Sequence, residues 1–411
     1  MTTVSPVDHI RRWSDAFTDI RRDLHAHPEL GFEEHRTARL VCDQLSAWKI
    51  EHHSGVGRTG IVAVIPGRAD DSGRRIGLRA DMDALPMQEE NDLAYRSRYD
   101  GRMHGCGHDG HTTMLLAAAR YLSETRNFDG VAYLIFQPGE EGHAGAKAMI
   151  DDGLFERFPA ERVFALHNWP ALPAGRIGIT PGPAMAAADR IEITIDGRGG
   201  HGAHPHIAVD PVLVAGHIIT AVQSIVSRNV SPLDTAVISL CAMQAGNPGA
   251  MSVIPAHARL VGTVRTFRPK TQDMIEQRLK ELVGSIAAAF GARAELKYER
   301  VYPPTINHDD DARFVGDVAE TLVGADNVLR NLEPSMGAED FSFMLQKKAG
   351  AYLRIGQDAR NGAFLHNSRY DFNDEILPLG AALHAGLIEQ GMPLAATRSE
   401  QPRKDAATAA P

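Results

Sequence analysis

The stretch VAYLIFQPGEEG (131–142) joins an apolar run to a tight turn and two adjacent glutamates. The run from Val131 to Phe136 has the length and composition of a buried strand, and the Pro-Gly pair after it marks a turn. Glu140 and Glu141 follow the turn directly. Because reactive groups in an open α/β sheet gather at the carboxyl ends of the strands, this stretch predicts a buried strand with a reactive site at its end.

Two further apolar runs end in polar side chains of the kind that bind metals. The runs are IGLRADMDALP (76–86) and RVFALHNWP (162–170), and the polar residues at their ends are Asp81, Asp83, His167 and Asn168. An isolated histidine in such a position is more often a core residue, but three strands ending alike favour a shared site. We therefore expect these side chains to converge.

A glycine-rich turn, HGCGHDGH (104–111), lies between the run at 76–86 and the run at 131–142. Its small residues let Cys106 and His108 approach one ion without crowding. A buried cysteine alone is usually a small hydrophobic residue, whereas a thiolate, an imidazole and a carboxylate together suit zinc or a similar ion.

The paired glutamates predict different roles for their two carboxylates. Adjacent residues on extended or turning backbone point in different directions, so one carboxylate can bind metal while the other faces a water molecule. The alternative is a solvated acidic turn. His366, in FLHNSRYDF, belongs to the late part of the chain, and spacing alone leaves open whether it returns to the same face.

Length and composition limit the classes of protein. At 411 residues the chain exceeds the roughly 250 to 300 residues at which one core stops growing, so two domains are expected. The net charge of -9 gives no reason to expect nucleic acid. No apolar stretch of signal-peptide or membrane-spanning length is evident, and three cysteines make no disulfide framework. We expect a cytoplasmic protein that binds neither nucleic acid nor membranes.

The pattern of elements divides the chain in three. Residues 1–185 and 302–411 alternate apolar runs with helical patterns, which predicts an α/β catalytic domain with a mostly parallel central sheet. Residues 186–301 predict the order βαββαβ, the ferredoxin-like α+β plan, inserted into the first domain. The polar, Ala-rich tail from about residue 393 is predicted to be disordered.

Eight motifs, in family order, resemble the M20 metallopeptidases, specifically the amidohydrolase branch with hippurate hydrolases, aminoacylase-like enzymes and plant indole-acetyl-amino-acid hydrolases. They are RRDLHAHPELGFEE, LRADMDALPMQE, MHGCGHDGHTTMLL, FQPGEEG, LHNWP, GRGGHGAHPH, GAEDF and LHNS. The resemblance implies a zinc-peptidase-like catalytic domain with an inserted dimerisation or lid domain. It also implies a centre of two divalent ions, Zn²⁺ or Mn²⁺, whose ligands would be Cys106, His108, Glu141, His167 and His366.

The same resemblance implies roles in catalysis. Glu140 would be the general base, which takes a proton from water and returns it to the departing nitrogen. The family forms dimers through the inserted domain, so His201 would reach the active site of the partner, where a donor is needed for the developing oxyanion. Asp83 would orient a ligand histidine.

The resemblance also implies a substrate contact within residues 186–301. Arg265, in ARLVGTVRTF, matches the position of a carboxylate contact, and a guanidinium suits bidentate pairing; a surface arginine is the alternative. Asn168 is also predicted to contact substrate. Ser252, in AMSVIP, replaces the family's usual asparagine, and Asp81 stands where the wider superfamily has a metal-binding histidine, which Cys106 replaces in this branch.

The predicted function is therefore metal-dependent hydrolysis of the amide bond of N-acyl-L-amino acids, with hippurate-like aromatic acyl groups favoured. The enzyme alternatives are a dipeptidase and a deacetylase of N-acetyl-amino acids or N-acetyl-diaminopimelate. The non-enzyme alternative is an inactive homologue that only binds metal or ligand. The likeness also implies a homodimer formed through the inserted domain.

Overall fold

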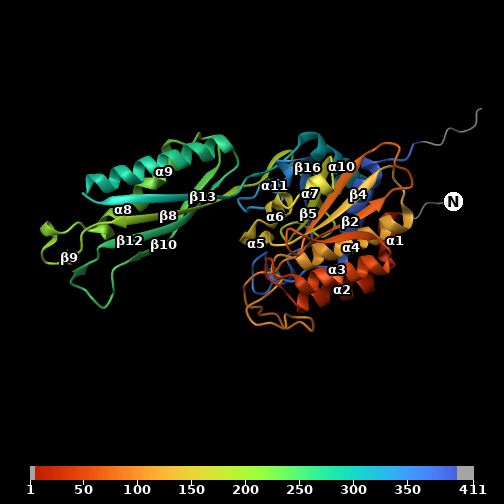
Figure 1. The fold of residues 1–411 in the computed structure, drawn as a ribbon, viewed down its shortest axis with the longest axis horizontal. Helices are drawn as coiled ribbons and strands as arrows, with labels where there is room; N and C mark the ends of the chain where they lie inside the picture. Colours follow the sequence, from red (N-terminus) through yellow and green to blue (C-terminus); the bar gives the residue numbers. More distant parts are fainter. Residues whose placement is uncertain (1–4, 396–411) are drawn as a thin grey trace, which may run out of the picture.

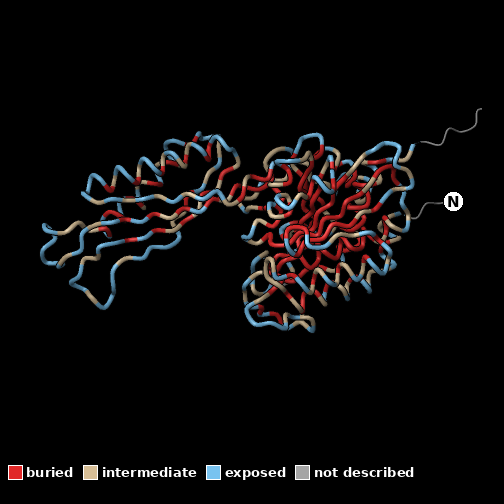
Figure 2. Tube along the Cα trace, viewed as in Figure 1, coloured by how far each residue is buried: buried red, intermediate tan, exposed pale blue. Residues whose placement is uncertain are grey.

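The computed structural model describes residues 5–395, which form two lobes joined by narrow connections (Figure 1). The large lobe contains both ends of the described chain, and the second lobe projects from it. Figure 2 shows buried residues filling the centre of the large lobe, whereas the second lobe has many exposed positions. Beyond Ala395, the tail that was predicted to be disordered lies outside the described residues.

The large lobe is built on an eight-stranded sheet with the order β1-β2-β4-β3-β5-β16-β6-β15. Strands β4, β3, β5 and β16 pair in parallel at its centre, while β1, β2 and β6 make antiparallel pairs toward the two sides. The α/β prediction is confirmed, with a sheet that is mixed rather than parallel throughout. The strands are β1 (Glu51–Val56), β2 (Gly60–Pro66), β3 (Arg75–Asp81), β4 (Val131–Gln137), β5 (Arg162–Trp169), β6 (Ile177–Gly178), β15 (Val328–Leu329) and β16 (Ala349–Gly356).

Helices cover both faces of this sheet, which is why its central strands are continuous apolar runs. On β4, Leu134 and Phe136 belong to one core, while Tyr133 and Ile135 belong to the other, as the strand period of two requires. The first core includes α1 (Pro6–Arg11), α2 (Ser14–Ala26), α3 (His35–Ala47), α4 (His108–Thr125), α10 (Asp309–Val323) and α12 (Leu377–Gly391). The second includes α6 (Gly145–Asp151) and α7 (Leu154–Arg157), which follow the short α5 (Glu140–His143), and α11 (Ser342–Leu345), which packs against α6.

The parallel strands end at a common edge, which positions the polar residues that follow them. Asp81 is paired with Gln137 at the ends of β3 and β4, and His167 lies beside Arg354 near the ends of β5 and β16. The paired glutamates begin three residues beyond Gln137. The convergence of polar groups is therefore a consequence of parallel pairing.

The second lobe is a four-stranded antiparallel sheet with the order β10-β12-β8-β13, with two helices packed against it (Figure 1). Its sequence order is βαββαβ, which agrees with the ferredoxin-like prediction. The elements are β8 (Ala187–Asp196), α8 (Pro211–Arg228), β10 (Ala236–Ala245), β12 (His257–Thr266), α9 (Pro269–Ala289) and β13 (Arg293–Tyr302). A small two-stranded sheet of β9 (Gly200–His201) and β11 (Val253–Ile254) forms the tip.

The chain enters the second lobe after β7 (Gly182–Met185) and returns from it into β14 (Thr305–Asn307), and these two strands pair with each other. The connections lie next to the predicted division at residues 186 and 301. That the two parts are independent domains stays a prediction.

Helix α8 is long and apolar enough to cross a membrane by length and composition, with a mean hydropathy of 1.2. In the structure, Val214, Ile218 and Val222 on this helix are buried in the core of the second lobe. Core helices of globular proteins meet the same criteria, so the feature is weak evidence for a membrane segment. The absence of a membrane partner stays a prediction.

Candidate active site and metal centre

A cavity of about 820 Å³ opens at the strand ends of the large lobe, where the second lobe joins it. The large lobe contributes Cys106, Glu140, Glu141, His167 and His366 to the wall, and the second lobe contributes Arg265 and Tyr302. The cavity therefore combines predicted metal ligands and the predicted base with a cationic side chain from the other lobe.

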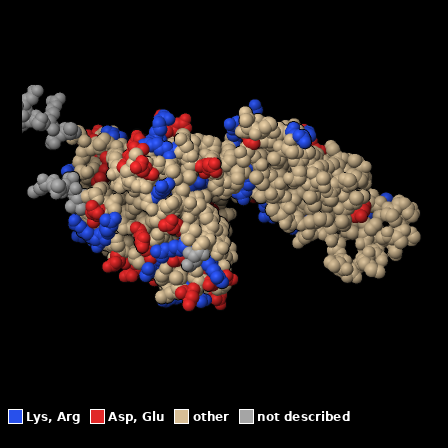
Figure 3. All heavy atoms as spheres, turned by 180° about the vertical axis from the view of Figure 1, so that it is seen from behind, with Lys and Arg blue, Asp and Glu red and all other residues tan. Residues whose placement is uncertain are grey.

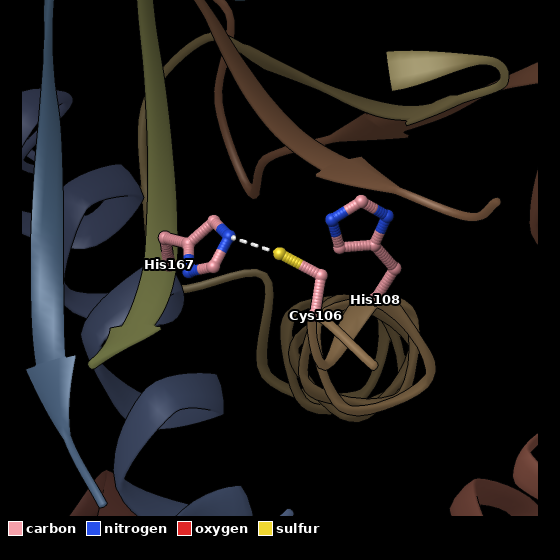
Figure 4. A group of neighbouring side chains, drawn as sticks. All are labelled: Cys106, His108 and His167. Atoms are coloured by element: carbon pink, nitrogen blue, oxygen red, sulfur yellow. Dashed lines mark hydrogen bonds between the residues drawn. The ribbon is translucent and has the colours of Figure 1, made fainter. Parts of the chain in front are cut away.

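The five predicted metal ligands occupy one place in the structure. Figure 4 shows Cys106, just before α4, pointing toward His167 at the end of β5, with the ring of His108 on the other side of the sulfur; the Cys106 sulfur lies 3.4 Å from His167 Nε2. The donor atoms fall into overlapping groups, each with its members within 4.8 Å of one another. The groups are Cys106–His108–His167, Cys106–Glu141–His366 and His108–Glu140–Glu141.

Two buried polar atoms in this cluster fit bound cations. Nε2 of His108 and Oε1 of Glu141 make no well-aligned hydrogen bond among residues 5–395, and Glu141 Oε1 lies 3.2 Å from Nε2 of His366, another predicted ligand. Asp83 explains their orientation, because its Oδ1 lies 3.2 Å from His108 Nδ1 and its Oδ2 accepts the Glu141 N–H at 2.8 Å. One carboxylate thus turns both groups inward, as expected of a residue that orients metal ligands.

The charge balance of the cluster also fits divalent cations. Burial lowers the pKa of His167 well below its ordinary value, which favours the neutral imidazole that binds metals. Burial, together with the nearby Glu141 and Glu140, raises the pKa of the Cys106 thiol. Burial and neighbouring carboxylates, Glu339 first among them, raise the pKa of Glu140. Cations bound here would offset this excess of acidic groups.

Beneath the cavity lies a buried arginine that sequence reasoning missed. The guanidinium of Arg79, 1% exposed, donates to Asp81 (2.6 Å), Gln137 (2.8 Å), Glu339 (2.9 Å) and Asp340 (3.0 Å). The backbone N–H of Asp340 in turn donates to Glu140 Oε1 at 3.3 Å. An arginine inside an apolar strand was the available signal for this network.

The structure places Asn168 behind the cavity wall. Its side chain is fully buried and does not line the cavity. Nδ2 donates to Tyr370 Oη (2.7 Å) and Gln357 Oε1 (3.1 Å), and Oδ1 lies 2.7 Å from His111 Nε2. Asn168 thus makes its hydrogen bonds within the protein in this structure, and its contact with substrate stays a prediction. Gly107 is needed beside it, because a Cβ there would lie 2.5 Å from Asn168 Oδ1.

The structure separates His201 from the other site residues. His201 is exposed in β9, at the tip of the second lobe, and does not line the cavity of its own chain (Figure 1). Arg265 on β12, in contrast, lies in the cavity wall. A role for His201 in the active site of a partner stays a prediction.

Known proteins share this sequence and fold. A family model described as peptidase family M20/M25/M40 matches residues 77–390. Hippurate hydrolase of Campylobacter jejuni is 43% identical over 371 residues, which cover 90% of this chain and 95% of that protein. N-acetylcysteine deacetylase of Bacillus subtilis is 38% identical with the same coverage. The crystal structure of Bacillus subtilis YXEP, described as a dinuclear metal-binding peptidase from the M20 family, matches with a TM-score of 0.81 and 33% identity over 93% of this chain and 99% of that chain.

The chain belongs to the peptidase family M20/M25/M40 and is an enzyme that acts on amides. The predicted resemblance is thereby confirmed. The similarity to a dinuclear metal-binding peptidase and the ligand clusters of this chain together support divalent metal ions as its cofactors.

We predict that Arg79→Met destabilises the fold by about 3–5 kcal/mol, because it leaves buried carboxylates without their cation. Arg75→Met in the same strand is the control, since Arg75 pairs with the half-exposed Asp70 and should cost less than about 1 kcal/mol. Urea unfolding followed by circular dichroism measures both. Equal losses in the two variants would contradict the role of Arg79.

Proposed function

We propose that the enzyme hydrolyses the amide bond of N-acyl-L-amino acids to a carboxylic acid and a free amino acid. The observation that carries the proposal is the cavity itself, which has a buried carboxylate beside the metal-ligand cluster on one wall and a guanidinium on another. An N-acyl-amino acid has the matching groups, since its amide bond lies next to a free carboxylate. The names of the hippurate hydrolase and N-acetylcysteine deacetylase relatives agree with this class of substrate.

Glu140 is the proposed proton carrier. Its carboxylate lies in the cavity wall beside the metal-ligand cluster, where it can take a proton from the attacking water, and the same carboxyl group then donates the proton to the departing nitrogen. Divalent ions, when bound, make water more acidic and polarise the amide carbonyl. We assign two of them, Zn²⁺ or Mn²⁺, to a ligand set of Cys106, His108, Glu141, His167 and His366.

Arg265 is the proposed partner of the substrate carboxylate. It is half-buried in the cavity wall and has no ion pair within the described part of the chain. The nearby Asp189 does not compete, because Gln272 Nε2 donates to both of its oxygens at 2.8 Å and the Tyr298 hydroxyl donates to one. The guanidinium is therefore free to make a bidentate pair with substrate.

An aromatic wall supports a preference for aromatic acyl groups. Trp169 and Phe364 line the cavity with their rings edge-on, 5.3 Å apart, and Phe364 is 42% exposed. A benzoyl ring would bury apolar surface that is otherwise open and would add a third aromatic contact. The deacetylase relative favours the alternative of small acyl groups.

We also propose a homodimer formed through the second lobe. Strand β10 lies at the edge of its sheet, and the lobe exposes the apolar side chains of Leu213, Val237 and Met243. Figure 3 shows few charged side chains on one face of this lobe. His201 and Ser252 lie together at its tip, away from their own cavity, where a second subunit would receive them. Cytoplasmic location and the choice between Zn²⁺ and Mn²⁺ stay predictions.

A substrate panel tests the reaction. We expect N-benzoylglycine to have a higher kcat/KM than N-acetylglycine or a dipeptide, with hydrolysis lost on chelation and restored by Zn²⁺ or Mn²⁺. Glu140→Gln should lower kcat by about 100-fold or more with metal content unchanged, whereas Cys106→Ala should lose metal. A preference for N-acetylglycine would favour the deacetylase, and no hydrolysis of any member would reject the proposed function.

A second measurement tests the carboxylate contact. Arg265→Met should lower kcat/KM for N-benzoylglycine by roughly 10- to 150-fold, the value of a charged hydrogen-bonded pair. N-benzoylglycinamide, which lacks the carboxylate, should be affected much less. Arg190→Met is the matched control, because Arg190 also lines the cavity but lies 3.5 Å from Glu192. Equal losses for the acid and the amide would contradict the contact.

Subunit mixing tests the placement of His201. His201→Ala and Glu140→Gln homodimers should both be nearly inactive. Dissociating and reassociating an equal mixture should restore roughly a quarter of wild-type activity, because mixed dimers regain one complete site. If a mixture that is shown to contain mixed dimers recovers no activity, His201 does not complete the active site of the partner subunit.

A further inference from the structure

The backbone that presents Glu140 is only partly helical, because α5 is four residues long and is interrupted at Glu141 and Gly142. Gly139, Gly142 and Ala144 all have left-handed φ values, of 57°, 81° and 55°, and Glu141 is non-helical inside the short α5. Ala144 is notable because residues with a side chain rarely adopt this conformation. Backbone amides in such a turn need partners from elsewhere in the fold.

Side chains from four separate parts of the chain supply these partners. Three are carboxylates of the large lobe, and the fourth is the hydroxyl of Tyr302. The hydrogen bonds are Gly139 N–H to Glu34 Oε1 (2.8 Å), Glu141 N–H to Asp83 Oδ2 (2.8 Å), Ala146 N–H to Asp340 Oδ2 (2.8 Å) and Ala144 N–H to Tyr302 Oη (3.2 Å). The turn is therefore shaped by distant side chains.

Tyr302 differs from the other three in what it binds and where it comes from. Its hydroxyl also donates to the Glu140 carbonyl oxygen at 2.5 Å, so one atom bridges both ends of α5. The side chain is 5% exposed, and its ring packs edge-on against Phe343 at 6.1 Å. Tyr302 is the last residue of β13 and pairs with Ala188 of β8, within the sheet of the second lobe. The strand that returns from that lobe is thus bonded directly to the backbone of Glu140.

We propose that Tyr302 is a positioning residue that aims the Glu140 carboxylate, an inference that rests on the proposed function of Glu140 as base. Its hydroxyl bridges the Glu140 carbonyl and the Ala144 amide and so closes the irregular turn. Because Tyr302 belongs to the second sheet, the same bond makes the position of the base depend on the orientation of the second lobe.

The test compares Tyr302→Phe with Tyr133→Phe in the metal-loaded enzyme. Tyr302→Phe removes only the bridging hydroxyl and keeps the ring against Phe343. Tyr133 is an equally buried tyrosine on β4, the strand that leads to Glu140, but near the opposite end of that strand. With N-benzoylglycine, Tyr302→Phe should lower kcat by roughly 5- to 100-fold, the effect of a lost buried hydrogen bond. KM should change less than about twofold, and Tyr133→Phe should resemble wild type.

Hydrogen exchange followed by mass spectrometry supplies a readout that does not depend on turnover. Peptides spanning residues 138–148 should exchange faster in Tyr302→Phe than in wild type or Tyr133→Phe, at equal metal content. Unchanged exchange in this turn, or a loss confined to KM, would overturn the proposal. If the wild-type enzyme hydrolyses no N-acyl-amino acid, the proposed function is rejected independently of Tyr302. The exchange rates of the turn still decide whether Tyr302 holds it.

Discussion

The pairing of one buried guanidinium with several carboxylates is the constraint on which the site depends. Arg79 joins the ends of β3 and β4 to the loop that carries Glu339 and Asp340, and Asp340 contacts both Glu140 and the turn that follows it. Without this cation, acidic groups would face one another in a buried region, where unpaired charge is strongly unfavourable. The arrangement of the base and metal ligands is therefore built on charge compensation beneath the cavity.

Much of the fold was predictable because it follows from local patterns. The apolar run of β4 and the βαββαβ order of residues 186–301 are properties of short windows, and the structure agrees with both. The antiparallel pairs at the sides of the large sheet were not predicted. Strands β6 and β15 have only two residues each, too few to show a period, and the direction of a pair depends on contacts between distant segments.

The candidate site also has residues that local sequence patterns predicted and residues that they did not. Glu141 and His167 were found because they lie at strand ends that parallel pairing brings together, and Cys106 was found from the glycine-rich turn before α4. Arg79 was missed because its partner Glu339 lies 260 positions away. The hydrogen bonds of Asn168 could not be predicted either, since only the fold brings His111 and Tyr370 to the two sides of its amide.

The chain passes between the lobes twice, and both passages run along the cavity. Met185 and Ala188 lie on the first passage, and Val301 and Tyr302 lie on the second. Both connections between the lobes are therefore part of the cavity wall, so the shape of the cavity is set by the backbone that joins the lobes as well as by the metal-ligand cluster.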